Sequence, residues 1–97
     1  MISDPILAAN KTKGAEIFAT NCAVCHRGGG NVIVAYKTLK KDALSKYLKG
    51  FDRHAEASVI DLITNGEHAM PGFKGYLSKD DIKKVATYVV QQAQTEW

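Results

Sequence analysis

Cys22-Ala23-Val24-Cys25-His26 is the stretch of sequence that decides the fold. It separates two thiols by two residues and places an imidazole directly after the second thiol. This spacing suits a c-type haem, in which each cysteine forms a thioether to one vinyl group of the porphyrin and the histidine binds the iron. The chain has only two cysteines and both lie in this stretch. The motif therefore predicts covalent haem c on Cys22 and Cys25, with His26 as an iron ligand.

Two other chemistries use the same residue types. A thioredoxin-like redox pair requires a βαβ context, and no strand-like alternation surrounds the motif. A zinc site requires a second ligand pair at short spacing, whereas His54 and His68 are distant from each other and from the motif. Haem is the favoured interpretation, and the thiol pair and the zinc site are its alternatives.

The length and composition favour a small folded domain that holds a cofactor. A chain of 97 residues has a marginal core of its own, to which a porphyrin would add a large apolar piece. With 45% hydrophobic and 24% charged residues, the chain is typical of folded soluble proteins. No apolar run approaches the ~18–20 residues of a membrane span. The net charge of +3 is spread along the chain, which disfavours nucleic-acid binding but allows a mildly basic surface to attract an acidic partner.

The first residues differ from the rest of the chain. Residues 1–9 lack the charged start and the full apolar stretch of a signal peptide, so we predict an N-terminal extension over 1–9 and one domain over 10–97. Attachment of haem through thioethers takes place outside the cytoplasm. We therefore expect an exported protein from which a targeting segment has been removed.

A first helix is predicted from Asn10, as its N-cap, to about Thr20. Gly14 lacks a side chain and precedes Phe18 by one turn, so another helix is expected to pack closely over this face.

Three further helices follow at helical spacing of apolar residues, and 31–38 is predicted as an irregular loop. Tyr47 is placed on the apolar face of the second helix, and Ser78 and Asp81 are placed at the cap and the capping-box position of the last. The predicted spans are Leu39–Lys49, Ala55–Asn65 and the segment that follows Ser78.

The chain offers few candidates for a second iron ligand. A Met or a second His in this position makes an electron-transfer centre. Apart from Met1, the only methionine is Met70, and the remaining histidines are His54 and His68. Met70 lies in a loop beside Pro71, which would stiffen the chain next to a weak ligand, so a role as core filler is less persuasive. Met70 is favoured, His68 is its rival, and His54 is interpreted as a surface residue.

Taken together, the motifs resemble those of the cytochrome c6 family, the small soluble photosynthetic cytochromes c of cyanobacteria and algae. The resemblance runs from about residue 10 to the end of the sequence. It is carried, in order, by Asn21-Cys22-Ala23-x-Cys25-His26, the glycine-rich loop with Asn31, Lys37-Thr38-Leu39, Asn65-Gly66, Ala69-Met70-Pro71-x-Phe73 and Gln91-Gln92-Ala93.

The resemblance implies an all-α class I cytochrome c fold, with four helices packed around one covalently bound haem. The first and last helices are expected to cross near Gly14, Phe18 and Tyr88. By the family pattern, the haem is carried by Cys22 and Cys25, and the iron is bound by His26 and Met70.

The resemblance also implies a function. Members carry electrons in the thylakoid lumen, from the cytochrome b6f complex to photosystem I or to a respiratory terminal oxidase. The expectation is a monomeric one-electron carrier in the thylakoid lumen or periplasm that docks transiently to membrane complexes. It would be neither an enzyme nor embedded in the membrane.

Two departures from the family pattern bear on this expectation. Leu62 occupies the position where the family usually has a haem-side Gln, as in variant branches that carry an aliphatic residue there. Tyr76 replaces an Arg associated with docking, and Lys74 supplies a charge without the planar geometry of Arg.

The change at Leu62 has two opposing effects on the reduction potential. Loss of an amide dipole lowers it, whereas drier surroundings disfavour the ferric centre and raise it. We expect the lowering to dominate, since the variant branches point that way. The alternative function is accordingly a low-potential haem sensor or regulatory cytochrome with a labile Met70.

Overall fold

The computed structural model describes the backbone of residues 5–95 and 97, and the side chains from residue 13 onward with 96 excepted. In this part of the chain the elements are helical, and β-structure is limited to isolated bridges. The elements are α1 (Pro5–Asn21), α2 (Ala23–His26), the 3-10 turn η1 (Arg27–Gly29), α3 (Lys41–Tyr47), α4 (Ala55–Asn65) and α5 (Lys79–Gln94). Within these residues, no helix combines the length and apolar composition that crossing a bilayer requires.

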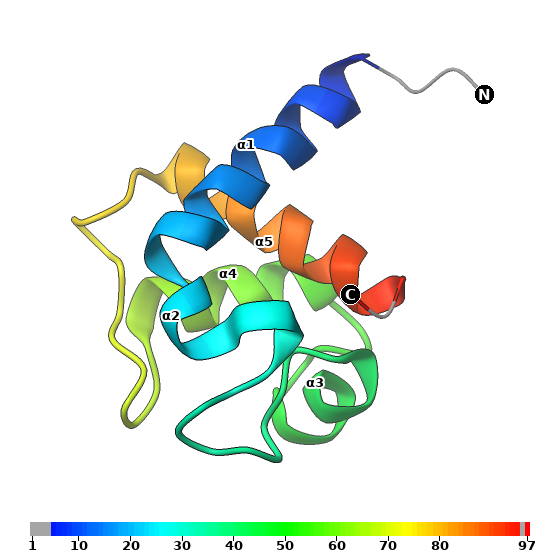
Figure 1. The fold of residues 1–97 in the computed structure, drawn as a ribbon, viewed down its shortest axis with the longest axis vertical. Helices are drawn as coiled ribbons and strands as arrows, with labels where there is room; N and C mark the ends of the chain where they lie inside the picture. Colours follow the sequence, from blue (N-terminus) through cyan, green and yellow to red (C-terminus); the bar gives the residue numbers. More distant parts are fainter. Residues whose placement is uncertain (1–4, 96) are drawn as a thin grey trace.

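Helices α1 and α5 cross in the upper half of the view in Figure 1, and α2, α3 and α4 lie below the crossing. Gly14 is buried at this crossing, where an added Cβ would lie 2.5 Å from the Lys84 carbonyl oxygen and 2.7 Å from the Tyr88 Cβ. Phe18, one turn further along α1, packs on Tyr88 with their ring centroids 5.5 Å apart. The predicted close approach at Gly14 is confirmed.

The hydrophobic core lies between α1, α4 and α5 and continues under α3. Val85 and Ala86 of α5 are fully buried, as the apolar spacing of this helix predicted. The Thr87 hydroxyl donates a hydrogen bond of 2.8 Å to the Glu56 carboxylate and joins α5 to α4. The other buried apolar side chains are Ile17, Phe18, Leu44, Phe51, Val59, Ile63, Ile82, Val89 and Ala93.

Helix α4 begins and ends where the sequence predicted, and α5 begins where it predicted. Helix α4 has the predicted bounds, and Gly66 follows it with a φ of 73°, a left-handed conformation that glycine adopts readily. At the start of α5, the Ser78 hydroxyl accepts a 3.0 Å hydrogen bond from the Asp81 backbone N–H. The predicted N-cap is therefore confirmed.

The start of the first helix was predicted wrongly. Helix α1 begins at Pro5, so Asn10 lies inside the helix rather than at its N-cap. Proline is favoured at the first helical position because its ring presets φ, and no glycine or further proline interrupts residues 6–13. Residues 1–4 of the predicted extension lie outside the described residues.

The second predicted helix, α3, is shorter than expected at both ends. The helix begins after Lys40, whose backbone is extended, with a ψ of 153°, as at an N-cap. Leu39 lies before this residue, and its N–H donates to the Gly29 carbonyl at 2.7 Å. Tyr47 ends the helix and is 40% exposed, so it lies outside the buried core, but it lines the same cavity as Leu44 and Leu48. The haem motif, which was predicted as a turn, instead contains the helical turn α2.

We predict that Gly14→Val destabilises the α1–α5 crossing. The new side chain would meet the α5 backbone at Lys84, which cannot rotate away, so the two helices must separate. Overpacking of this kind lowers the free energy of unfolding by about 1–3 kcal/mol. Urea denaturation measures the change.

The control for this prediction is Ala19→Val on the same helix. Ala19 is exposed, so the control adds the same β-branched side chain without the contact. Equal losses of stability in the two variants would contradict close packing at Gly14.

Candidate haem site

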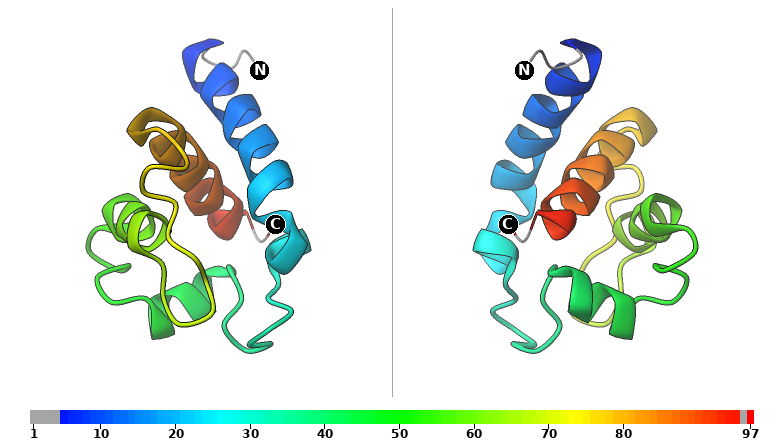
Figure 2. Two further views of the ribbon diagram at one scale, coloured as in Figure 1. Left: turned by 90° about the vertical axis from the view of Figure 1, so that its left-hand side faces the viewer. Right: turned by 90° about the vertical axis from the view of Figure 1, so that its right-hand side faces the viewer.

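A largely apolar cavity opens between the segment that contains α2 and the segment that contains α4 and the loop after it. Figure 2 shows these two segments facing each other. The core side chains Phe18, Leu44, Val59, Ile63 and Val89 form part of the cavity wall, so the cavity is continuous with the hydrophobic core. A flat apolar cofactor placed here would complete the core.

The haem motif forms one hydrogen-bonded turn beside this cavity. The Cys25 and His26 backbone N–H groups both donate to the Cys22 carbonyl, at 3.1 and 2.9 Å. Residues three apart on such a turn lie on the same side, and all three side chains line the cavity. The structure therefore brings together the three residues that the sequence predicted.

His26 is held by its Nδ1 atom, which lies 2.8 Å from the Gly30 carbonyl oxygen. A carbonyl oxygen can only accept a hydrogen bond, so Nδ1 carries the proton and donates it. The neutral ring then has its lone pair on Nε2, and the hydrogen bond to Nδ1 makes that lone pair more basic. This is the tautomer that an iron ligand requires.

The protonation of Cys22 disfavours a thiol–disulfide oxidoreductase. Burial, with a smaller effect from the nearby Cys25, raises the pKa of the free Cys22 thiol to about 11. Reactive redox thiols have a lowered pKa, because the thiolate is the nucleophile. The surrounding structure is also helical rather than βαβ. Cys22 therefore fits an attachment point better than a redox pair.

Asn31 shapes the loop between the motif and α3. Its side-chain oxygen accepts hydrogen bonds from the Ile33 and Val34 N–H groups, at 2.9 and 2.8 Å. Its side-chain amide donates to the Lys37 carbonyl at 2.9 Å. An asparagine after a glycine run is a known signal for such a turn, but sequence reasoning had used Asn31 only as part of the family resemblance.

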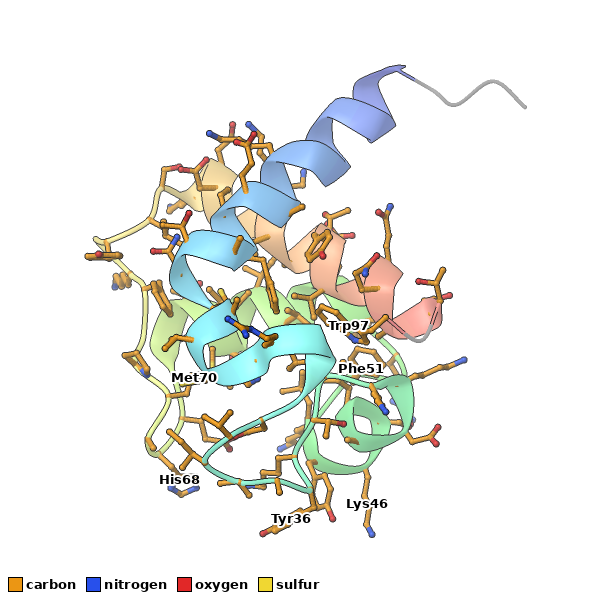
Figure 3. All side chains as sticks on the ribbon, in the orientation of Figure 1. Tyr36, Lys46, Phe51, His68, Met70 and Trp97 are labelled. Atoms are coloured by element: carbon orange, nitrogen blue, oxygen red, sulfur yellow. The ribbon has the colours of Figure 1, made fainter. Side chains whose placement is uncertain are left out.

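Met70 lies in a loop that is tied to its own ends and to α4. Met70 and Glu67 exchange two backbone hydrogen bonds of 2.8 and 3.0 Å, and the Phe73 N–H donates to the Ile63 carbonyl at 2.8 Å. The Met70 side chain is half-buried, lines the cavity and packs against the core (Figure 3). The fold therefore presents the thioether to the same cavity as the His26 imidazole.

Two glycines allow this loop to pack so closely on the end of α4. A Cβ at Gly66 would lie 2.5 Å from the Met70 carbonyl oxygen, and one at Gly72 would lie 2.8 Å from the Asn65 carbonyl oxygen. The close contact with Met70 explains why a glycine follows Asn65 in the sequence.

The remaining candidates are distributed unequally around the cavity. Leu62 lines it, as expected for the position of a haem-side residue. His68 also lines it but is exposed, whereas Met70 is half-buried. His54 does not line it and precedes α4. Among the described residues, no three His, Cys, Asp or Glu side chains gather in a way that could hold a metal ion, so the zinc alternative gains no support.

The residues present fit haem c. Two thiols lie on one turn beside a histidine whose Nε2 is available, a thioether faces the same cavity, and the walls are mostly apolar. Cys22, Cys25, His26 and Met70 would hold the group, and Leu62 would lie against it. This donor set supplies both soft thiols for attachment and the Met/His pair of cytochromes c.

The family model "Cytochrome C oxidase, cbb3-type, subunit III" matches residues 9–89. The cytochrome c6 of Limnospira maxima is 60% identical over 84 residues, which cover 87% of this chain and 94% of that protein.

Solved structures agree with this comparison. Cytochrome c6 of the diatom Phaeodactylum tricornutum has a TM-score of 0.85 at 47% identity and covers 90% of this chain and 98% of its own. Oxidized cytochrome c6A of Arabidopsis thaliana has a TM-score of 0.80 at 30% identity, with coverage of 91% and 94%. The all-α class I cytochrome c fold is confirmed. The chain belongs to the cytochrome c6 family of electron carriers with covalently bound haem c.

Proposed function

We propose that this chain carries single electrons through a haem c joined by thioethers to Cys22 and Cys25, with the iron bound by His26 and Met70. When bound, haem c supplies an iron that alternates between the ferric and ferrous states. The observation that carries the proposal is that the oriented His26 imidazole and the tied Met70 loop face one apolar cavity.

The proposed ligands His26 and Met70 are fixed by different contacts, and a fixed pair of ligands suits an electron carrier. Hydrogen bonding to Gly30 fixes the tautomer and orientation of His26. Backbone bonds to Glu67 fix the Met70 loop. With both axial positions filled by the protein, no position remains for a substrate. We therefore propose a carrier rather than an enzyme or a ligand-binding sensor.

The proposed partners are membrane redox complexes, namely cytochrome b6f and either photosystem I or a terminal oxidase, in the thylakoid lumen or periplasm. Val24 and Val32 beside the motif are 82% and 71% exposed, which supports a transient apolar contact. Tyr76 is 75% exposed where an Arg was expected, so docking would lack that bidentate cation. We further propose a monomer with its domain over 10–97.

We predict that Met70→Ala opens an axial position, whereas His68→Ala does not. Carbon monoxide at neutral pH is expected to leave the absorption spectrum of the ferrous parent protein unchanged, because Met70 occupies the iron position that the gas would bind. Met70→Ala should bind carbon monoxide, and His68→Ala should behave as the parent does.

The same experiment distinguishes the alternatives. Carbon monoxide binding by the parent protein would favour the sensor with a labile Met70. Binding by His68→Ala alone would identify His68 as the ligand and contradict our assignment.

We predict that Leu62→Gln raises the midpoint reduction potential. The amide would return a dipole to the cavity beside the haem and stabilise the reduced form. A potentiometric titration followed through the haem bands measures the shift.

The control is Leu62→Ile, which keeps an apolar side chain of the same volume and adds neither an amide nor a thioether. It should leave the potential close to that of the parent. An equal rise in both variants, or no rise with Gln, would contradict the dipole account.

A further inference from the structure

Trp97 follows α5 and reaches back to the loop after the haem motif (Figure 3). Its indole Nε1–H donates a hydrogen bond of 2.9 Å to the Leu39 carbonyl. Its backbone N–H donates to the Gln92 carbonyl at 2.7 Å, which anchors it to the end of α5. One side chain therefore joins α5 to a segment far away in the sequence.

The indole also lies directly on Gly29. A Cβ at this glycine would come within 2.6–2.7 Å of the Cγ, Cδ1 and Cδ2 atoms of Trp97. Gly29 is the buried residue of η1 and has a φ of 83°, so both its conformation and this contact require glycine. The backbone at this point is clamped against the ring.

Trp97, Gly29 and Leu39 each contact the other two, close to His26 in the fold. Trp97 holds Gly29 by packing and Leu39 by its hydrogen bond, and the Leu39 N–H donates to the Gly29 carbonyl at 2.7 Å. The next carbonyl along the chain, that of Gly30, accepts the Nδ1–H of His26 at 2.8 Å. The acceptor that orients the proposed iron ligand is thus one residue from the atoms that Trp97 clamps.

We infer that Trp97 is a positioning residue for His26: it fixes the Gly29–Gly30 backbone so that the Gly30 carbonyl stays in hydrogen-bonding geometry with Nδ1. This inference rests on the proposed function, in which His26 binds the iron. A firm hydrogen bond to Nδ1 increases the basicity of Nε2, which favours the ferric state. Loosening the clamp weakens the bond and raises the midpoint potential.

A purely structural role is the competing explanation, because Trp97 also packs in an aromatic cluster. Its ring centroid lies 5.2 Å from that of Phe18 and 5.9 Å from that of Tyr88. Tyr88 packs on the same Phe18, at 5.5 Å. Within the described residues, however, no hydrogen bond links the Tyr88 side chain to the 27–39 loop. Tyr88 therefore provides a matched control.

The experiment compares Trp97→Phe with Tyr88→Leu in the haem-loaded protein. Trp97→Phe keeps an aromatic ring but removes the donor to Leu39, and Trp97→Tyr serves as a second variant without an indole N–H. Solvent exchange of the His26 Nδ1 proton is followed by NMR in the ferrous protein, together with the midpoint potential and the urea denaturation midpoint.

In the Trp97 variants we expect exchange of the His26 Nδ1 proton to be about fivefold faster, the change that loss of one ordinary hydrogen bond implies. The midpoint potential should rise at the same time. Tyr88→Leu should lower stability and leave both readouts unchanged. If Trp97 variants lose stability as Tyr88→Leu does, with unchanged exchange and potential, the inference is overturned.

Failure of the proposed function has a different signature. In that case the parent protein itself would show no His26 or Met70 resonance displaced by the haem ring current. That result overturns both the ligand assignment and the role of Trp97, whereas unchanged readouts in the Trp97 variants overturn the role of Trp97 alone.

Discussion

The hydrogen bond from His26 Nδ1 to the Gly30 carbonyl is the constraint on which the rest of the site depends. The C-x-x-C-H spacing places the imidazole, but only this bond decides which nitrogen faces the cavity. The Gly30 carbonyl stays within hydrogen-bonding distance of His26 because further contacts fix the loop that follows it. Asn31 closes its turn, and Trp97 secures it from the far end of the chain. The His26 imidazole is thus oriented by contacts that reach from residue 26 to residue 97.

The other side of the cavity is built on a different plan. There the Met70 loop is held by its backbone. Glu67 and Met70 exchange paired hydrogen bonds, and glycines let the loop lie against α4. Between the two sides, the cavity wall is shared with the core side chains of α1, α4 and α5. In so short a chain, cofactor binding and core formation are therefore parts of one process.

Local signals predicted the parts of the structure that local interactions decide. The bounds of α4 and the Ser78 cap depend on residues close in sequence, and the structure confirms them. Helix α3 begins later than predicted because Lys40 is extended, and Leu39 beside it bonds to Gly29, a tertiary contact that its apolar spacing does not show. Trp97 was missed for the same reason, since no nearby pattern shows which loop its indole will reach. The candidate iron ligands could be ranked from the sequence, but only the fold shows that they share one cavity.

We propose that His26 and Met70 bind the iron in both oxidation states, so that the chain carries electrons without changing its ligands. A potentiometric titration of the intact protein, run in the oxidative and reductive directions and followed through the haem bands, tests it most directly. We expect one reversible one-electron transition in this titration, with spectra of a Met/His-ligated haem in both oxidation states. Hysteresis between the two directions, absence of the methionine-dependent band in the ferric state, or a high-spin spectrum in either state would contradict it.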